Sequence, residues 1–327
     1  MKAPSFNTTV LFYPNKNPQL RLFALWYFTT LIIIWNILGH TYLGFEQSWA
    51  APVTAVCTAV AVQMLLEWID ASARGREIRF AGSWGNFVNS LPAAFIPGFA
   101  CGMLLYPNER LWPIIFAVVL SIGSKVLLRA PVGGGRTQHI FNPSNFGVAL
   151  TLVLFPQVGF APPYHFTENI TGVWDWILPG IILASGIIIH GCFTGRLPLV
   201  LAWVIGFIVQ GQIRARIFDV PPLVPVMPMT SAAFIVFTLY MVPDPATTPL
   251  KPWRQVFFGF SVAMVYGIIQ VLHLVFGLFF ALLTVCAIRG LSLHLYYAFK
   301  SPDRAQPESQ AVPVPLPVSG LPISPAV

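Results

Sequence analysis

Residues 22–69 decide the fold class, and they read LFALWYFTTLIIIWNILGHTYLGFEQSWAAPVTAVCTAVAVQMLLEWI. The part from Leu22 to Gly44 contains no Asp, Glu, Lys or Arg, and the part after Trp49 contains none before Glu67. A helix needs about 20 mostly apolar residues to cross the hydrocarbon core of a bilayer. Both parts come close to or exceed that length, so the sequence predicts two consecutive membrane spans.

The composition of the whole chain supports a membrane protein. Hydrophobic residues make up 56% of the 327 residues and charged residues only 9%, whereas soluble domains carry about 25% charged residues. Too few charges remain to cover a water-facing surface. The net charge of +7 comes from residues spread over many loops, so we expect the lipid bilayer as a partner and no nucleic acid.

The apolar pattern recurs along the chain and predicts an all-α polytopic membrane protein with about ten transmembrane helices. An N-terminal segment (1–21) without a cleavable signal precedes the transmembrane domain (22–295), and a Pro-rich tail (296–327) without helical periodicity follows it. The predicted spans are 22–44, 49–69, 87–106, 111–128, 143–157, 174–192, 197–211, 231–242, 255–272 and 274–293.

Lysine and arginine positions predict the topology. If the N-terminus is cytoplasmic and the spans alternate, all 18 basic residues fall on the inside except Arg110, Arg214 and Arg216. Inside loops are the ones enriched in Lys and Arg. We therefore expect both termini in the cytoplasm and an even number of crossings.

Two short or interrupted spans hold matching places in the two halves of the domain (about 22–157 and 174–293). The third span contains Pro92 and Pro97, and the eighth (231–242) is short and bounded by prolines. Proline removes a backbone hydrogen bond, and interrupted helices at corresponding positions indicate an inverted repeat with a binding site between its halves. The layout predicts two inverted five-helix repeats.

A first polar stretch runs from a glycine-rich turn into an apolar helix and reads GGGRTQHIFNPSNFG from Gly133 to Gly147. Glycines and a helix start leave backbone N–H groups free for a ligand. Asn142 and Asn145 lie one turn apart and are candidates to face one cavity. The same Asn-Pro pair also suits a helix cap, and the two roles are compatible.

Two further polar stretches are candidates. Thr230 precedes the eighth span and Asp244 follows it between two prolines, where a carboxylate either binds a ligand or stabilises the turn. In the other stretch, Asn86 and Asn89 follow the charged loop 66–79, whose arginines suit lipid phosphates. The histidines and cysteines show no ligand spacing, so we predict no metal site and no catalytic residue.

The stretch SKVLLRAPVGGGRTQHIFNPSNFGVALTLVLFP, residues 124–156, resembles the membrane subunits RnfD and NqrB of bacterial flavin-dependent electron-transport complexes. Lys125, the three glycines, the Phe141-Asn142-Pro143 block and Phe155-Pro156 match their pattern. LEWIDASARGREIR (66–79) and FTLYMVPDPATTP (237–249) are also similar to their sequences. The resemblance covers roughly residues 60–295.

This resemblance implies a bacterial inner-membrane protein with ten helices in two inverted repeats, similar to urea and ammonium channels. It also implies flavin, which those subunits carry as FMN on the threonine of an SGAT-type motif and, in NqrB, as noncovalent riboflavin. The corresponding loop here reads FTENITG (166–172). Because SGAT is absent, we do not expect covalent FMN on Thr167 or Thr171. The chain resembles a divergent branch that includes the RnfD-like proteins of enediyne biosynthesis.

The leading hypothesis is an electron-transport subunit that holds FMN or riboflavin noncovalently between the repeats and works with other membrane or redox subunits. One side of the flavin site would be formed by Gly134, Gly135, Thr137, Asn142 and Asn145, and the other by Asn86, Asn89, Thr230 and Asp244. The alternatives are a transporter of a small solute or ion on the same scaffold, or a scaffold subunit without a cofactor. The scaffold alone does not choose between them.

Overall fold

The computed structural model describes residues 18–300, and helices dominate it. In chain order the elements are α1 (Pro18–Leu38), η2 (Gly39–Leu43), α2 (Ala50–Arg74), α3 (Trp84–Ser90), α4 (Pro92–Leu104), β1 (Leu105–Tyr106), α5 (Trp112–Leu127), β2 (Arg129–Gly133), β3 (Arg136–His139), α6 (Pro143–Leu154), β4 (Gly159–Phe160), α7 (Trp174–Ile188), η3 (Ile189–Thr194), α8 (Leu197–Ile217), η4 (Val224–Thr230), α9 (Ala232–Val236), η5 (Phe237–Met241), α10 (Pro252–Val271) and α11 (Gly277–Phe299). The prefix η marks short π or 3₁₀ turns. The predictions for residues 1–17 and 301–327 lie outside the described residues.

Within residues 18–300, seven helices are long and apolar enough to cross a membrane, and counting one bent pair as a span gives eight. The helices α5 and α6 are apolar but shorter. Each predicted apolar segment coincides with a helix, which confirms an all-α polytopic membrane protein. The count of ten crossings stays a prediction. The seven are Gln19–Leu43, Ala50–Arg74, Trp84–Leu104, Trp174–Thr194, Leu197–Ile217, Pro252–Val271 and Gly277–Phe299.

The two segments that we expected to be interrupted differ. The eighth bends by 75° between η4 and α9. The third is one span of 21 residues, Trp84–Leu104, without a bend above 40°. Pro92 stands at the start of α4, where the missing N–H group has no helical partner to lose. The predicted break in the third segment is therefore wrong, and the inverted repeat loses one of the two features that predicted it.

The predicted tail also begins too early, because α11 continues through residue 296 to Phe299. The apolar run ends near residue 293, but the polar and aromatic residues that follow it extend the helix. Hydropathy detects where a helix leaves the apolar layer and not where its backbone hydrogen bonds stop. The same reason explains why α2 and α8 run several residues beyond their predicted ends.

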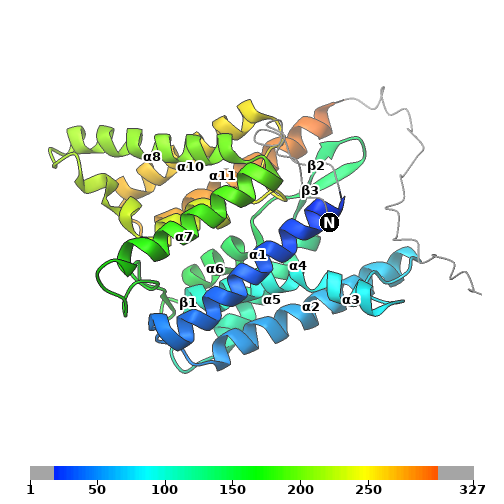
Figure 1. Cartoon of the computed structure of the whole chain (residues 1–327). Coiled ribbons are helices and arrows are strands. Elements are labelled where there is room, and N and C mark those ends of the chain that lie inside the picture. The colour runs from blue at the N-terminus through cyan, green and yellow to red at the C-terminus, as the bar shows by residue number, and fades with distance from the viewer. Residues whose placement is uncertain (1–17, 301–327) are drawn as a thin grey trace, which may run out of the picture.

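The helices form two groups, α1–α6 and α7–α11 (Figure 1). In the first group α2 packs on α4 and α5, and α5 packs on α6; in the second α10 packs on α8 and α11. Glycine permits the closest contacts in both. A Cβ atom on Gly147 of α6 would strike the carbonyl oxygen of Ala117, and one on Gly259 of α10 would strike that of Leu199. Small residues at such contacts are typical of membrane helices.

Several helix ends and one hairpin gather polar residues at one end of the molecule, here named the basic end. There α2 stops at Gly75, whose φ of 61° closes the helix as glycine commonly does. Ser83 caps the start of α3 by accepting the N–H of Asn86. β2 and β3 pair antiparallel with Arg129 opposite His139. Figure 1 shows this hairpin beside α11, on which β2 packs.

Candidate functional site

A cavity of about 600 Å³ lies at the basic end, within the first group of helices. Its walls come from α2, the loop 75–83, the junction of α3 with α4, the end of α5 and the hairpin. About half the lining is apolar (Val60, Met64, Leu66, Phe80, Leu91, Ala93, Ala94, Ile122 and Val126), and the rest is polar (Gln63, Glu67, Asp70, Arg74, Arg79, Ser90, Lys125, Arg129, Thr137 and His139). Binding sites for small molecules typically occupy about 300–1,000 Å³.

The two carboxylates of the lining are neutralised by arginines. Arg76 donates to both oxygens of Glu67, at 2.6 and 3.0 Å, and to Asp70 at 2.6 Å. Arg74 forms a second ion pair with Asp70 at 2.8 Å. These contacts raise the pKa of Arg76. Because Arg76 itself does not line the cavity, it holds the acidic residues from behind and leaves the other cations of the lining uncompensated.

Lys125 and Arg129 bind neutral groups only. The Lys125 ammonium donates to Gln63 Oε1 at 3.1 Å and to the Ala93 carbonyl at 2.7 Å. Arg129 donates to Thr137 Oγ1 at 2.8 Å and to the Lys125 carbonyl at 2.9 Å. In residues 18–300 no carboxylate lies within 4.0 Å of either cation. Burial, and then the nearby Arg74 and Arg79, lower the pKa of Arg129.

His139 shares the cavity with these cations. Burial, followed by the charges of Arg129 and Lys125, lowers the pKa of His139 to about 4. The imidazole is therefore neutral at pH 7, with one donor and one acceptor nitrogen. Its Nδ1 is buried and has no hydrogen-bond partner in the described part of the chain. The cavity thus combines positive charge, a neutral imidazole and an extended apolar wall.

The glycine-rich turn joins β2 to β3. Gly134 and Gly135 are exposed, with φ of 59° and 67°, and neither has a neighbour within 4 Å of an added Cβ. Gly133 differs, because an added Cβ would lie 2.7 Å from the hydroxyl of Tyr297 in α11. The glycines serve the hairpin's backbone geometry, and Thr137 is the one predicted site residue that lines the large cavity.

Asn142 and Asn145 join the two groups of helices. Asn142 Oδ1 caps α6 by accepting the N–H of Asn145 at 3.0 Å, and its amide donates to the Met241 carbonyl at 3.0 Å. The amide of Asn145 donates to the Phe279 carbonyl at 3.1 Å, while its Oδ1 is buried without a partner among the described residues. The structure thus shows the cap that the Asn-Pro pair suits and adds two bonds to the second group.

Asp244 organises the turn that follows η5. Its carboxylate accepts the N–H of Ala246 at 3.0 Å and the hydroxyl of Thr247 at 3.2 Å. Burial raises the pKa of Asp244, and these bonds and the charge of Arg196 oppose the shift. The geometry is that of a structural turn, which was one of the two roles considered for this residue.

Two arginines bind the Asp244 turn, here defined as residues 244–248. Arg196 donates to Thr248 Oγ1 at 2.9 Å and to the Pro245 carbonyl at 3.3 Å. Arg289 donates to the Thr247 carbonyl and to Gln138 Oε1, both at 2.8 Å. Gln138 in turn donates to the Thr248 carbonyl at 3.0 Å. The turn therefore fastens the hairpin of the first group to α11 of the second.

The remaining predicted residues lie elsewhere. Asn86 donates to the Ala81 carbonyl, Asn89 accepts the indole N–H of Trp26 at 3.3 Å, and exposed Thr230 donates to the Met227 carbonyl. Within residues 18–300 no hydrogen bond connects these three with Asn142, Asn145 or Asp244. The structure does not bring the predicted set together as one two-sided site.

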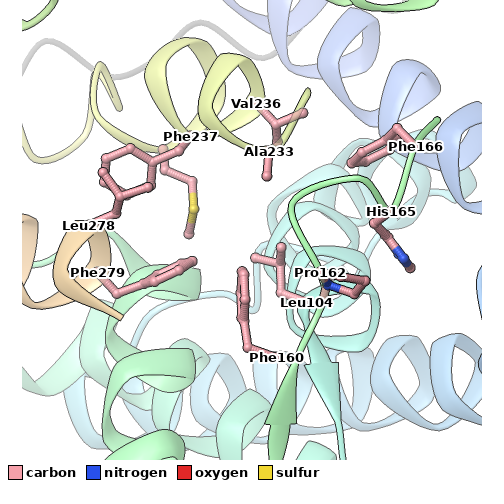
Figure 2. Close-up of a pocket in the computed structure, with 12 residues that line it drawn as sticks. Leu104, Phe160, Pro162, His165, Phe166, Ala233, Val236, Phe237, Leu278 and Phe279 are labelled. Carbon is pink, nitrogen blue, oxygen red and sulfur yellow. The ribbon is translucent and has the colours of Figure 1, made fainter. Parts of the chain in front are cut away.

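Figure 2 shows a second, smaller cavity where the two groups meet. It measures about 40 Å³ and is lined mainly by apolar side chains, among them Phe160, Phe237 and Phe279, which leaves room for a few water molecules at most. His165 at its edge binds the Tyr106 hydroxyl at 2.8 Å. Burial lowers the pKa of His165 to about 3. This cavity is too small for a flavin.

Five residues that shape the basic end were not predicted from the sequence: Gln63, Arg129, His139, Arg196 and Arg289. One of them carried a usable signal, because Arg289 stands inside an apolar span, and a charge there indicates a function or a partner. The other four lie at helix ends or in the hairpin, where polar residues are ordinary. Their roles depend on contacts across more than 25 positions of sequence.

Comparison with known proteins gives one partial similarity. No protein-family model matches the chain. A stretch of 145 residues, 41% of this chain, is 28% identical to the RnfD protein of the ion-translocating oxidoreductase complex of Actinobacillus succinogenes. The match spans 36% of that protein, well under two thirds of its length. The chain is thus similar in part to this RnfD protein, which agrees with the resemblance carried by the Phe141-Asn142-Pro143 block.

Proposed function

We propose that this chain is a membrane-embedded subunit of an electron-transport complex and that it binds a flavin noncovalently. The observation that carries the proposal is the similarity to the RnfD protein of an ion-translocating oxidoreductase complex. The helices of spanning length agree with a membrane subunit. Partner subunits would deliver and accept the electrons.

The cavity at the basic end fits a flavin better than the contact between the two helix groups. Its volume of about 600 Å³ lies within the usual range for ligands of this size. The apolar wall suits the face of an isoalloxazine ring, and Gln63, Ser90 and Thr137 offer hydrogen bonds to its polar edge. When bound, the flavin supplies the electron chemistry, while the protein positions it and excludes water.

This placement changes the site that the sequence suggested. Asn142 and Asn145 already bind backbone groups of the second group, so we assign them to the support of the hairpin. Thr137 and the residues next to Asn89, namely Ser90 and Leu91, remain at the cavity. A covalent flavin on Thr167 or Thr171 would lie beyond the far end of α4, about 20 Å away.

The test is an absorption spectrum of the purified full chain, followed by acid precipitation and chromatography of the supernatant. We expect flavin in the supernatant, and a loss of it in Gln63→Leu, which removes a polar group of the cavity. Asn169→Leu, at the opposite end of the molecule, is the control and should retain the flavin. Flavin that stays with the precipitate would show a covalent bond, and absence of flavin from gently purified protein would refute the proposal.

A small-solute transporter is the second candidate. The cavity of about 40 Å³ between the helix groups (Figure 2) is the observation that favours it, because small solutes commonly cross such scaffolds where two repeats meet. Solute flux into proteoliposomes, sensitive to Phe237→Trp, would support this candidate. Flux that is equal with and without the protein would remove it.

A further inference from the structure

We infer that the cavity at the basic end binds a ligand that carries a phosphate group, with Lys125 and Arg129 as the residues that contact the phosphate. As applied to the flavin, this inference rests on the proposed function and narrows it, because the bound flavin would be FMN rather than riboflavin. Its support comes from the charges of the lining and from the partners that each charge already has.

The lining contains four fixed cations, Arg74, Arg79, Lys125 and Arg129, and two carboxylates. Both carboxylates are bound by Arg76, which approaches from outside the lining. The cavity therefore carries an excess of positive charge. An anionic ligand would neutralise it, whereas a neutral ligand would leave it in place.

Lys125 and Arg129 are the cations with the weakest compensation. They follow one another by one helical turn at the C-terminal end of α5, where the helix dipole favours cations. Their hydrogen-bond partners are neutral oxygens of Gln63, Ala93 and Thr137. A guanidinium and an ammonium within one turn form the donor set that phosphate oxygens accept best.

Two sources supply this chemistry. One is the phosphate of FMN, and the other is the headgroup of an anionic phospholipid, because the cavity lies at the ends of membrane helices. Both place a phosphate near Lys125 and Arg129, and they differ in what is attached to it. Free inorganic phosphate serves as the minimal probe.

The experiment titrates the purified full chain, in uncharged detergent, with FMN and with riboflavin and follows flavin fluorescence. We expect FMN to bind about tenfold more tightly than riboflavin, with an advantage that shrinks at high salt. Arg129→Gln should reduce that ratio to about threefold or less. Arg110→Gln, an exposed cation at the opposite end, is the matched control and should leave the ratio unchanged.

Arg129 also holds the hairpin, so a second variant guards against a folding defect. The Arg74 side chain is 72% exposed and makes a single ion pair, so Arg74→Gln should fold normally and still weaken FMN by about threefold. The third arm measures whether inorganic phosphate, or phosphatidic acid in nanodiscs, raises the melting temperature of the native chain.

Each outcome supports or overturns the inference. Tighter FMN binding that Arg129→Gln and Arg74→Gln both weaken supports it. Equal binding of FMN and riboflavin overturns it and leaves the proposed function standing. If neither flavin binds but phosphatidic acid stabilises the native chain and not Arg129→Gln, the phosphate site stands with a lipid as its source and the proposed function fails. If neither flavin, lipid nor inorganic phosphate has an effect, both fail.

Discussion

The two groups of helices both bury cations at the basic end, but they satisfy them differently. In the second group, Arg196 and Arg289 donate to oxygens of the Asp244 turn, and Arg196 is only 1% exposed. In the first group, Lys125 and Arg129 line a cavity of about 600 Å³. The same residue types at the same end of the fold therefore form a closed contact in one group and an open one in the other.

The difference arises from what the chain places against the cations. The Asp244 turn presents its own carbonyl and hydroxyl oxygens to Arg196 and Arg289, which are thereby bound within the protein. The hairpin that covers Lys125 and Arg129 supplies fewer oxygens, because two residues of its turn are exposed glycines, Gly134 and Gly135. A buried cation thus indicates a ligand only where the surrounding backbone does not already serve it.

The largest effect should come from breaking the closed contact. Arg196→Met removes two hydrogen bonds from a buried guanidinium and leaves Asp244 without a nearby cation, so we expect the free energy of unfolding to fall by about 3 kcal/mol. Thermal unfolding in detergent measures this. Flavin or phosphate binding to folded protein should be unchanged.

Arg79→Met is the control from the open contact. Its side chain is 77% exposed and lies 4.0 Å from Glu67, so its removal should cost no more than about 0.5 kcal/mol. Equal losses of stability in the two variants would contradict the distinction between a closed and an open contact.

The next effect concerns the hairpin that covers the cavity. Gly133→Ala adds a Cβ at φ of 93°, close to the Tyr297 hydroxyl, and we expect it to lower stability by about 2 kcal/mol. Gly134→Ala has a φ of 59° and open space around it, so its cost should be about 1 kcal/mol. Hydrogen exchange of the hairpin amides should rise in Gly133→Ala alone. Matching exchange in both variants would show that contact with α11 does not hold the hairpin.

The sequence predicts the helices well and the site poorly, for a physical reason. Hydropathy is a local property, and it located every helix from α1 to α11 because lipid-facing and buried residues are both apolar. It failed at Pro92, where proline starts a helix segment rather than breaking a span. The site depends on which polar groups already have partners. Asn142 and Arg129 look equally available in the sequence, and only long-range bonds such as that from Asn142 to Met241 separate them.

The smallest effect sharpens the comparison through pH. The pKa of His139 is lowered to about 4 in the folded chain, against about 6.5 when unfolded. Between these values the unfolded chain binds more protons, so the stability contributed by neutral His139 is present above about pH 6.5 and is lost as the pH falls toward 4. We expect a loss of about 1–2 kcal/mol between about pH 7 and pH 5.

His139→Asn should remove this part of the pH dependence, measured as melting temperature against pH, whereas His273→Asn, an exposed histidine outside the cavity, should preserve it. The cations Arg129 and Lys125 contribute to the lowered pKa of His139. A phosphate bound to them would offset their charge and raise that pKa toward its ordinary value, so inorganic phosphate should flatten the native profile. A profile that phosphate leaves unchanged while it still binds would show that the anion lies away from Arg129 and Lys125, and the contrast between the two basic contacts would then rest on packing alone.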